Sequence, residues 1–358
     1  MSTDLFSPIA LGPLTLPNRL VMAPMTRSRT GAADTPTDLA ATYYAQRATA
    51  GLIIAEATQV SALAKGYPLT PGIYNNAQVA GWRSVTDAVH AKGGRIFLQL
   101  WHVGRVALQS VLPDNALPVG PSAVKPAGKT FTGEEYVTPR ALELSEIPSI
   151  VEQYRNGAGH AKAAGFDGVE IHGANGYLLD QFLRDGTNQR TDAYGGSEAN
   201  RARLLLEVTE AVIDVWGKER VGVRLSPFSA FNDMRDSDPV TTFAYAARKL
   251  SDMGIVYLHI IEPINSDHIM AVPGVEPIAP LLRESFQGIV MLNGGYNKET
   301  GNAAIESGAA DMISFGIPFL TNPDLVRRYA ENAALNAPDQ STMYGGDAHG
   351  YTDYPTLA

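Results

Sequence analysis

The chain has no cysteine, and this absence excludes several kinds of chemistry. Without a thiol it can form no disulfide, no thiolate nucleophile and no Cys-ligated metal centre. No uninterrupted apolar run reaches the 18 residues or more that a transmembrane helix needs. Residues 1–8 carry neither a basic stretch nor an apolar core, so no secretory signal is predicted. We therefore expect a cytoplasmic protein that has no membrane partner.

An excess of positive charge is also lacking. The 28 Lys and Arg residues stand against 37 Asp and Glu, which leaves a formal net charge of −9. This balance argues against a nucleic-acid partner. The seven histidines are scattered, with no His-x-His or His-Glu-x-x-His spacing, so no metal site is predicted. At 45% hydrophobic and 18% charged residues, the composition is that of an ordinary globular protein.

Short apolar runs alternate with helical patterns along most of the chain. Such alternation is typical of a parallel sheet, and eight units favour an α/β fold of the (β/α)8 TIM-barrel type. A doubly wound sheet is the rival, but no Gly-x-Gly-x-x-Gly follows a strand. With no linker and no repeat, we expect one domain over residues 1–358. The eight predicted strands are 18–24, 52–56, 95–100, 167–171, 220–225, 256–261, 288–292 and 310–315.

Two further segments stand out beside this regular pattern. Residues 5–16 alternate weakly around Gly12-Pro13, which predicts an N-terminal β-hairpin over one end of the barrel. Residues 103–147 contain five prolines and no sustained periodicity. A loop of this length in a compact domain is usually a lid or a binding excursion, and this one follows the third strand.

The fourth predicted strand ends in a turn that carries three polar side chains, His172, Asn175 and Tyr177. Catalytic groups of α/β barrels lie at such strand ends. His172 and Asn175 can both donate hydrogen bonds to one oxygen, and Tyr177 has one proton to give. Taken singly, each residue also has a structural explanation, as a satisfied histidine, a turn residue or a packing residue. Together they suit a reaction that builds an enolate and then protonates carbon.

The other strand ends are chemically rich as well. Gly294, Gly295 and Gly316 lie where a barrel commonly binds phosphate through backbone N–H groups, and Lys298 follows them. Gln99 and Arg224 are suited to the amide edge and the negative charge of a heterocycle. Tyr67, Trp101 and Tyr351 could stack nearby. The site is therefore better suited to a phosphorylated aromatic cofactor than to a metal.

At these positions the chain resembles the old yellow enzyme family of FMN-dependent ene-reductases, in particular the branch of N-ethylmaleimide and pentaerythritol tetranitrate reductases. The resemblance runs from about residue 4 to the C-terminus. Its segments are His172-Gly-Ala-Asn-Gly-Tyr-Leu-Leu-Asp-Gln-Phe-Leu, Asn188-Gln-Arg-Thr-Asp, Tyr194-Gly-Gly, Asn18-Arg-Leu-Val-Met-Ala-Pro-Met-Thr-Arg, Gln99-Leu-Trp-His-Val-Gly-Arg and Gly350-Tyr-Thr-Asp-Tyr-Pro.

The resemblance implies non-covalent FMN and a role for each matching residue. His172 and Asn175 would hold the substrate oxygen, and Tyr177 would be the proton donor. Three aromatic residues would shape the substrate pocket, namely Tyr67, Trp101 and Tyr351. The flavin would contact Pro24, Met25, Thr26, Ala57, Gln99, His172, Arg224, Asn293, Gly294, Gly295, Gly316 and Ile317.

The implied reaction has two halves. NADPH, with NADH as the alternative, would reduce the flavin, and flavin N5 would then give a hydride to the β-carbon of an enone, enal, maleimide or nitroalkene. Tyr177 protonates the α-carbon. The resemblance fails at Ile317, where the family usually has an arginine that binds the phosphate. Such a contact contributes about 1.5–3 kcal/mol, so we expect weaker FMN retention.

Three alternatives stay open from the sequence. The same flavin chemistry could serve mainly nitrate esters or nitroaromatics. A flavin-free barrel lyase or isomerase could use the phosphate site for its substrate, although no strand carries an evident Schiff-base lysine. A flavin-binding protein without catalysis is the third. We expect small-molecule substrates and a monomer or weak homodimer.

Overall fold

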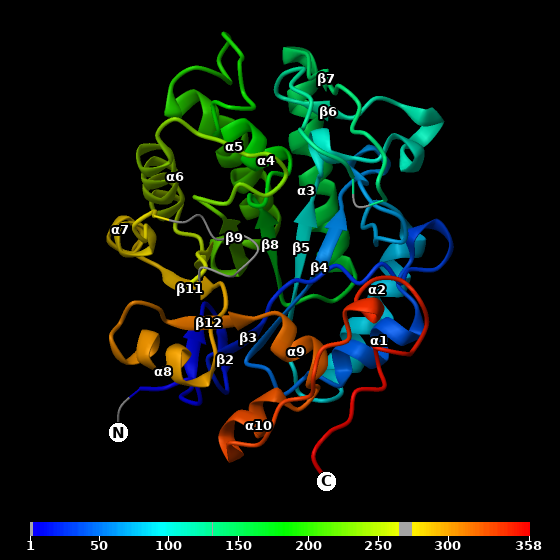
Figure 1. Cartoon of the computed structure of the whole chain (residues 1–358), viewed down its shortest axis with the longest axis vertical. Coiled ribbons are helices and arrows are strands. Elements are labelled where there is room, and N and C mark those ends of the chain that lie inside the picture. Colours follow the sequence, from blue (N-terminus) through cyan, green and yellow to red (C-terminus); the bar gives the residue numbers. More distant parts are fainter. Residues whose placement is uncertain (1–2, 131, 265–273) are drawn as a thin grey trace.

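Eight parallel strands close into a barrel in the computed structural model, which describes residues 3–130, 132–264 and 274–358. Each strand pairs with the one before it, and β12 pairs with β3 to close the ring. The predicted (β/α)8 TIM barrel is therefore confirmed (Figure 1). The strands are β3 (Leu20–Met22), β4 (Leu52–Gln59), β5 (Ile96–Trp101), β8 (Gly168–His172), β9 (Val221–Leu225), β10 (Tyr257–Ile261), β11 (Ile289–Asn293) and β12 (Met312–Phe315).

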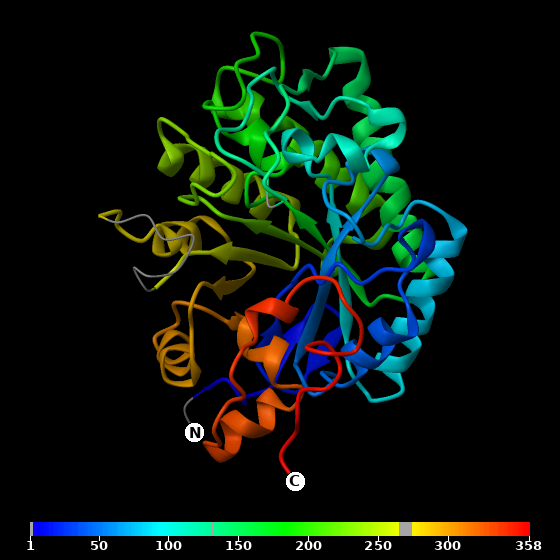
Figure 2. The same cartoon turned by 45° about the vertical axis from the view of Figure 1, so that its right-hand side comes forward.

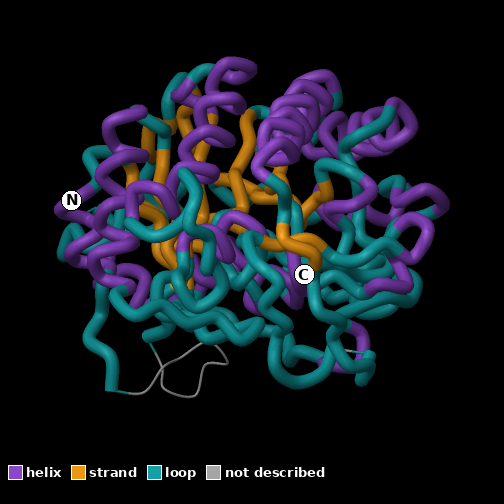
Figure 3. The backbone as a smooth tube through the Cα atoms, turned by 90° about the horizontal axis from the view of Figure 1, so that it is seen from above, coloured by secondary structure: helices purple, strands orange, loops and turns teal. Residues whose placement is uncertain are grey.

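Helices surround the barrel, and most loops gather on one side of the strands (Figure 3). Side-chain caps start several of them: Asn75, Ser197 and Asp238 each accept a hydrogen bond from a backbone N–H in the first helical turn. Among the described residues, no helix is long and apolar enough to cross a membrane. The helices are α1 (Asp38–Ala45), α2 (Asn76–His90), α3 (Ile147–Ala163), α4 (Leu178–Leu183), α5 (Glu198–Trp216), α6 (Pro239–Met253), α7 (Ala279–Ser285), α8 (Lys298–Glu306), α9 (Ile317–Thr321) and α10 (Leu325–Glu331).

The barrel interior changes from apolar to polar along its axis. At one end the predicted hairpin, β1 (Ile9–Leu11) with β2 (Leu14–Leu16), packs Leu11 and Leu16 against Phe97 and Met291. Because side chains alternate along a strand, the residue two positions after Phe97 also points inward, and it is Gln99. Buried polar residues occupy this next layer, which leads to the C-terminal strand ends. They are Gln99, Glu170, Arg224, His259 and Ser314.

Several predicted boundaries differ from the structure. The first barrel strand was predicted over 18–24 but spans Leu20–Met22, and the second was predicted over 52–56 but continues to Gln59. The excursion after β5 holds a small two-stranded sheet, β6 (Val119–Gly120) with β7 (Arg140–Ala141), which the sequence did not predict. Helix α9 was also missed, because one short turn after Gly316 leaves no periodicity to detect.

The C-terminal segment returns to the start of the barrel. It runs beside α1 in two views of the molecule (Figures 1 and 2). The Gln46 amide donates to the Thr352 carbonyl at 2.8 Å. Arg27 Nη2 donates to the Gly350 carbonyl at 2.8 Å, and Arg29 Nη2 donates to the Thr342 carbonyl at 2.7 Å. The loop after β3 thus holds residues that lie more than 300 positions later in the chain.

Candidate active site

The turn after β8 is fixed through its backbone. Asn175 and Gly176 both have left-handed backbones, with φ of 59° and 72°. A Cβ on Gly176 would approach Met234 Cγ to 2.7 Å, so only glycine fits there. The Asn175 N–H donates to Ser226 Oγ at 2.7 Å, and its carbonyl accepts from Asn232 Nδ2 at 2.8 Å. Two hydrogen bonds therefore fix the backbone of Asn175, from which its side chain extends.

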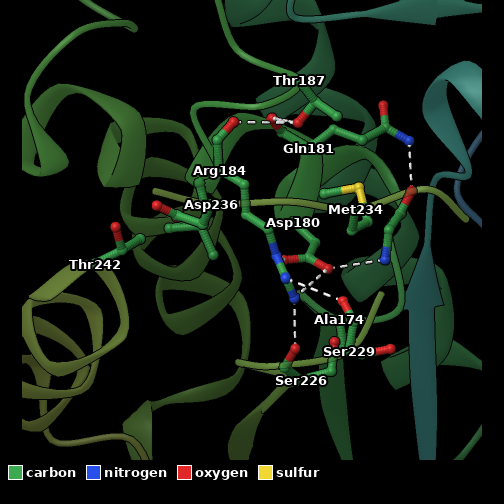
Figure 4. A network of polar contacts seen from close by, with 12 residues as sticks. Ala174, Asp180, Gln181, Arg184, Thr187, Ser226, Ser229, Met234, Asp236 and Thr242 are labelled. Atoms are coloured by element: carbon green, nitrogen blue, oxygen red, sulfur yellow. Dashed lines mark hydrogen bonds and ion pairs between the residues drawn. The ribbon is translucent and has the colours of Figure 1, made fainter. Parts of the chain in front are cut away.

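A buried ion pair between Asp180 and Arg184 supports this turn from behind (Figure 4). Arg184 Nε lies 2.8 Å from Asp180 Oδ1, and the two side chains are 2% and 0% exposed. Asp180 Oδ2 accepts the Gly176 N–H at 2.8 Å, while Arg184 donates to the carbonyls of Ser226 and Ser229. The pair thus joins the β8 turn to the loop that follows β9.

Four aromatic rings lie together at this strand end. The Tyr177 ring meets the His172 and Trp101 rings edge-on, with centroid separations of 4.9 Å and 5.0 Å. Tyr67 stacks on Trp101 at 5.7 Å, and the Tyr67 and Tyr177 hydroxyl oxygens are 3.4 Å apart. The structure therefore brings together four of the predicted site residues, which come from three separate segments.

The protonation states follow from these surroundings. Burial, together with Arg224 and His259, holds the pKa of His172 well below its usual value, so the imidazole is neutral. His172 Nδ1 accepts the Ala174 N–H at 3.3 Å, which leaves the ring proton on Nε2 as a donor. Burial raises the pKa of Tyr177 to about 12, so its hydroxyl keeps its proton at neutral pH.

Several buried polar atoms in and around the barrel mouth have no partner among the described residues. They include Arg224 Nε, Trp101 Nε1 and Asn175 Oδ1. An unsatisfied buried polar group is costly, so these atoms indicate a polar ligand. Arg224 Nη2 donates to Asn293 Oδ1 at 3.0 Å, which joins two predicted cofactor residues. The other predicted contacts lie at neighbouring strand ends, with Ala57 and Gln99 buried and Pro24, Met25 and Thr26 partly buried after β3.

The ends of β11 and β12 offer backbone rather than side chains. Gly294 and Gly295 have φ of 136° and 88°, and a Cβ on Gly294 would lie 2.5 Å from the Glu262 carbonyl oxygen. Gly316 precedes α9, where Ile317 is 51% exposed.

Lys298, the cation predicted beside this edge, is engaged elsewhere. It begins α8 and donates to Asn332 at 2.5 Å. Arg19 and Arg283 both contact Asp311, which precedes β12 and so lies at the opposite end of that strand. Within the described ranges, the phosphate edge predicted here therefore relies on backbone N–H groups.

Tyr351 is placed apart from these aromatic rings. Its ring is 1% exposed and stacks on Tyr43 at 4.3 Å, and the Arg27 and Arg29 guanidinium groups lie over the same ring at 5.0 Å and 4.7 Å from its centroid. This position argues against the predicted substrate-binding role. The prediction rested on the resemblance and not on the contacts of this tail, which the sequence does not show.

Two other tyrosines near the site were missed. Tyr136, from the excursion, packs against the cluster that contains Trp101 and Leu112. Tyr344, from the C-terminal segment, is 68% exposed, and it adds to the raised pKa of both Tyr67 and Tyr177, as Tyr136 does. Both are isolated aromatics in irregular segments, which is the only signal that the sequence offered. A cavity of about 310 Å³ lies beside Tyr136 but contains none of the predicted site residues.

The chain matches a known family model over residues 4–336, described as the NADH:flavin oxidoreductase / NADH oxidase family. It is 46% identical to 12-oxophytodienoate reductase 1 of Oryza sativa subsp. japonica over 359 residues, which cover 99% of this chain and 93% of that protein. It is 42% identical to 12-oxophytodienoate reductase 2 of Arabidopsis thaliana, over 99% and 96% of the two chains.

Solved structures agree with these relatives. Morphinone reductase superposes with a TM-score of 0.94 at 49% identity, over 100% of this chain and 97% of that one. An old yellow enzyme homologue from Zymomonas mobilis gives a TM-score of 0.95 at 48% identity, over 99% and 100%. Since sequence and fold agree over nearly the whole length, the chain belongs to the NADH:flavin oxidoreductase / NADH oxidase family, the family of the old yellow enzymes.

Proposed function

We propose that this oxidoreductase is an FMN-dependent ene-reductase that uses NAD(P)H to reduce activated alkenes such as enones, enals, maleimides and nitroalkenes. The observation that carries the proposal is the cluster of His172, Tyr177 and Trp101 at the end of β8, with a neutral imidazole and a protonated phenol. A hydrogen-bond donor and a proton donor side by side are what reduction of a polarised double bond requires.

The residues present fit FMN. Gln99 would face the amide edge of the ring, and Arg224, with its unpartnered Nε, would sit beside the ring's negative end. Gly294, Gly295 and Gly316 would hold the phosphate. When bound, FMN would supply a two-electron carrier between the nicotinamide and the alkene. The ring would also contact Pro24, Met25, Thr26, Ala57, His172 and Asn293, with Ile317 near the phosphate.

His172 and Asn175 would hold the activating oxygen of the substrate. The Nε2 proton of His172 points away from the turn because Nδ1 already accepts from Ala174. Both donors are neutral N–H groups. They would stabilise the negative charge that develops on the substrate oxygen through hydrogen bonds, and neither would change its protonation state. Such contacts strengthen as the oxygen becomes enolate-like, and the barrier falls for that reason.

Tyr177 would give its proton to the α-carbon. A phenol whose pKa is raised to about 12 by burial stays protonated through the neutral range and gives up its proton only to a strong base. A carbanion-like carbon is such a base. The Tyr67 hydroxyl, 3.4 Å away, can orient the Tyr177 hydroxyl, and Trp101 would form a wall of the pocket.

The relatives are consistent with a carbonyl substrate and a nicotinamide donor. The curated relatives are named for 12-oxophytodienoate and one structural neighbour for morphinone, both oxo compounds. Morphinone reductase has been solved in complex with tetrahydroNAD. We keep NADPH as the expected donor for this chain, with NADH as an alternative.

An anaerobic visible spectrum of the purified protein tests the proposal. A flavin band should bleach on addition of NADPH or NADH and return on addition of cyclohexenone. If the band returns only with oxygen, the ene-reductase assignment fails while FMN binding stands. If it returns with a nitrate ester but not with any alkene, the same flavin chemistry serves a different substrate. No flavin after incubation with FMN would remove the cofactor itself.

A further inference from the structure

One carboxylate lies inside the barrel, below the predicted flavin site, and collects hydrogen bonds from three sides. Glu170 Oε1 accepts from Gln99 Nε2 at 2.7 Å. Glu170 Oε2 accepts from the Tyr257 hydroxyl at 3.1 Å and from His259 Nδ1 at 2.8 Å. Glu170 is 0% exposed. Since β8 and β10 are not neighbours in the ring, these bonds cross the barrel interior.

The protonation states in this layer are well defined. Burial acts to raise the pKa of Glu170, but His259, Arg224 and Gln99 together lower it below its usual value, so the carboxyl is ionised. Burial lowers the pKa of His259, which stays neutral. An ionised carboxylate cannot donate, so His259 carries its proton on Nδ1, and Nε2 accepts from Ser314 Oγ at 2.7 Å.

These states dictate how the Gln99 side chain faces the barrel mouth. A carboxylate only accepts, so the end of the Gln99 amide that meets Glu170 must be its NH₂ group. The carbonyl oxygen is then left as an acceptor for a ligand N–H. The assignment of amide nitrogen and oxygen, usually ambiguous, is fixed here by the charge of the neighbour.

We propose that Glu170 is a positioning residue for the cofactor: it orients the Gln99 amide toward the flavin's imide edge, and its negative charge sets how readily the flavin is reduced. This inference rests on the proposed FMN site. Glu170 and Arg224 are the two opposite charges of the layer. Reduction adds negative charge to the ring beside Arg224, and Glu170 opposes that change through the low-dielectric interior.

The two parts of the role give different measurable effects in the holoenzyme. Replacing the charge, Glu170→Gln, should raise the flavin midpoint potential by about 30 mV or more, a tenfold change for a two-electron couple. The new amide would also turn Gln99 around, so that an NH₂ group faces the flavin N–H. The dissociation constant for FMN, measured by fluorescence quenching on the deflavinated protein, should rise at least tenfold.

A second variant separates orientation from charge and guards against a misfolded first variant. Glu170→Asp keeps the charge but shortens the reach to Gln99. It should weaken FMN binding at least severalfold and leave the potential near that of the unaltered protein. The matched control is Tyr257→Phe, which removes one donor to the same carboxylate. It should change the FMN dissociation constant by less than about threefold, and it should shift the flavin midpoint potential by no more than the equivalent of a threefold change in the reduction equilibrium.

The outcomes are distinguishable from failure of the proposed function. If the unaltered protein binds no FMN, the proposed function falls first. If it binds FMN and is reduced normally, while Glu170→Asp leaves FMN affinity unchanged, the orienting role is overturned. A folded Glu170→Gln protein with an unchanged potential overturns the electrostatic role. Equal effects of Tyr257→Phe and the Glu170 variants would reduce Glu170 to a packing role.

Discussion

The two sides of the barrel mouth are built in opposite ways. At the end of β8, the His172 side chain is buried and the Tyr177 side chain is partly buried, and the turn between them is held by the Asp180–Arg184 ion pair. At the ends of β11 and β12, glycines present backbone, and the first residue of α9 is an exposed isoleucine. One side is held by several buried side chains, and the other presents mainly glycine backbone.

The difference reflects what each side would have to do. A proton donor and the hydrogen-bond donors to a substrate oxygen must be positioned to within a fraction of an ångström. Such precision requires neighbouring side chains that are themselves fixed by packing and hydrogen bonds. A phosphate is a large anion that does not need such precise positioning. Several backbone N–H groups can bind it together without a contribution from any particular side chain. Loss of a side chain is therefore expected to abolish chemistry on the first side and to change affinity by degrees on the second.

The largest effect should come from removing the phenol of the β8 side. Tyr177→Phe should slow alkene reduction by about 10²–10⁴-fold, the usual contribution of a general acid. Reduction of the flavin by NADPH should be almost unchanged, because Tyr177 has no proton to give in that half. Stopped-flow measurement of the two half-reactions tests this. An equal loss in both would show that Tyr177 acts on packing and not as the acid.

The second largest effect should come from breaking the Asp180–Arg184 ion pair, which supports the turn after β8. Asp180→Asn leaves the buried Arg184 charge unpaired, which should lower the free energy of unfolding by about 3–5 kcal/mol. Urea denaturation measures it. Glu331→Gln is the control, since Glu331 and Arg327 have the same i,i+4 spacing but are about half exposed. That exposed pair should contribute about 0–1 kcal/mol. If both variants lose a similar free energy of unfolding, the buried Asp180–Arg184 pair does not stabilise the turn after β8 more than an exposed pair would.

A buried carboxyl on a third strand extends the comparison through its pH dependence. Burial raises the pKa of Glu56, within β4, to about 7. The folded protein therefore binds a proton that the unfolded chain releases near pH 4.5, and stability from this group falls as pH rises from about 4.5 to 7. At about 1.36 kcal/mol per pKa unit, the fall is roughly 3 kcal/mol.

Glu56→Gln measures this contribution by difference. The stability of the variant relative to the unaltered protein should increase between pH 4.5 and pH 7, and then level off. Thermal or urea unfolding at several pH values gives the curve. A flat difference across this range would mean that the Arg27 N–H and the Tyr44 hydroxyl, which both contact Glu56, keep its carboxyl ionised.

The smallest effect should come from the phosphate side. Ile317→Arg should tighten FMN by about 1.5–3 kcal/mol, the contribution of a charge-assisted hydrogen bond. Fluorescence titration of the deflavinated protein measures the dissociation constant. Ile317→Gln is the uncharged control and should gain much less. If the arginine brings no gain, the phosphate does not lie at the start of α9.

The sequence predicted most of the architecture because the barrel strands are continuous apolar runs and their helices are regular. It also predicted that His172, Asn175 and Tyr177 share one turn after a strand, since a polar segment interrupted by Gly173 and Gly176 is a local signal. It could not place Tyr351, whose position is decided by arginines more than 300 residues away. Nor could it find Glu170 as a partner of Gln99, because that contact depends on the register of β5 with β8. The single domain, the residue roles and the monomer or weak homodimer stay predictions.

The hold of Arg27 and Arg29 on the C-terminal segment has a consequence for biosynthesis. The barrel closes only when β12 reaches β3, and residues 342–350 reach Arg27 and Arg29 later still. During synthesis, the loop that follows the first barrel strand therefore emerges long before residues 342–350, which supply acceptors for its arginines. We expect the two arginine side chains to stay hydrated until those residues have been made. We therefore expect the segment that carries Tyr344 to take its place near the site late in folding, after the barrel strands have paired.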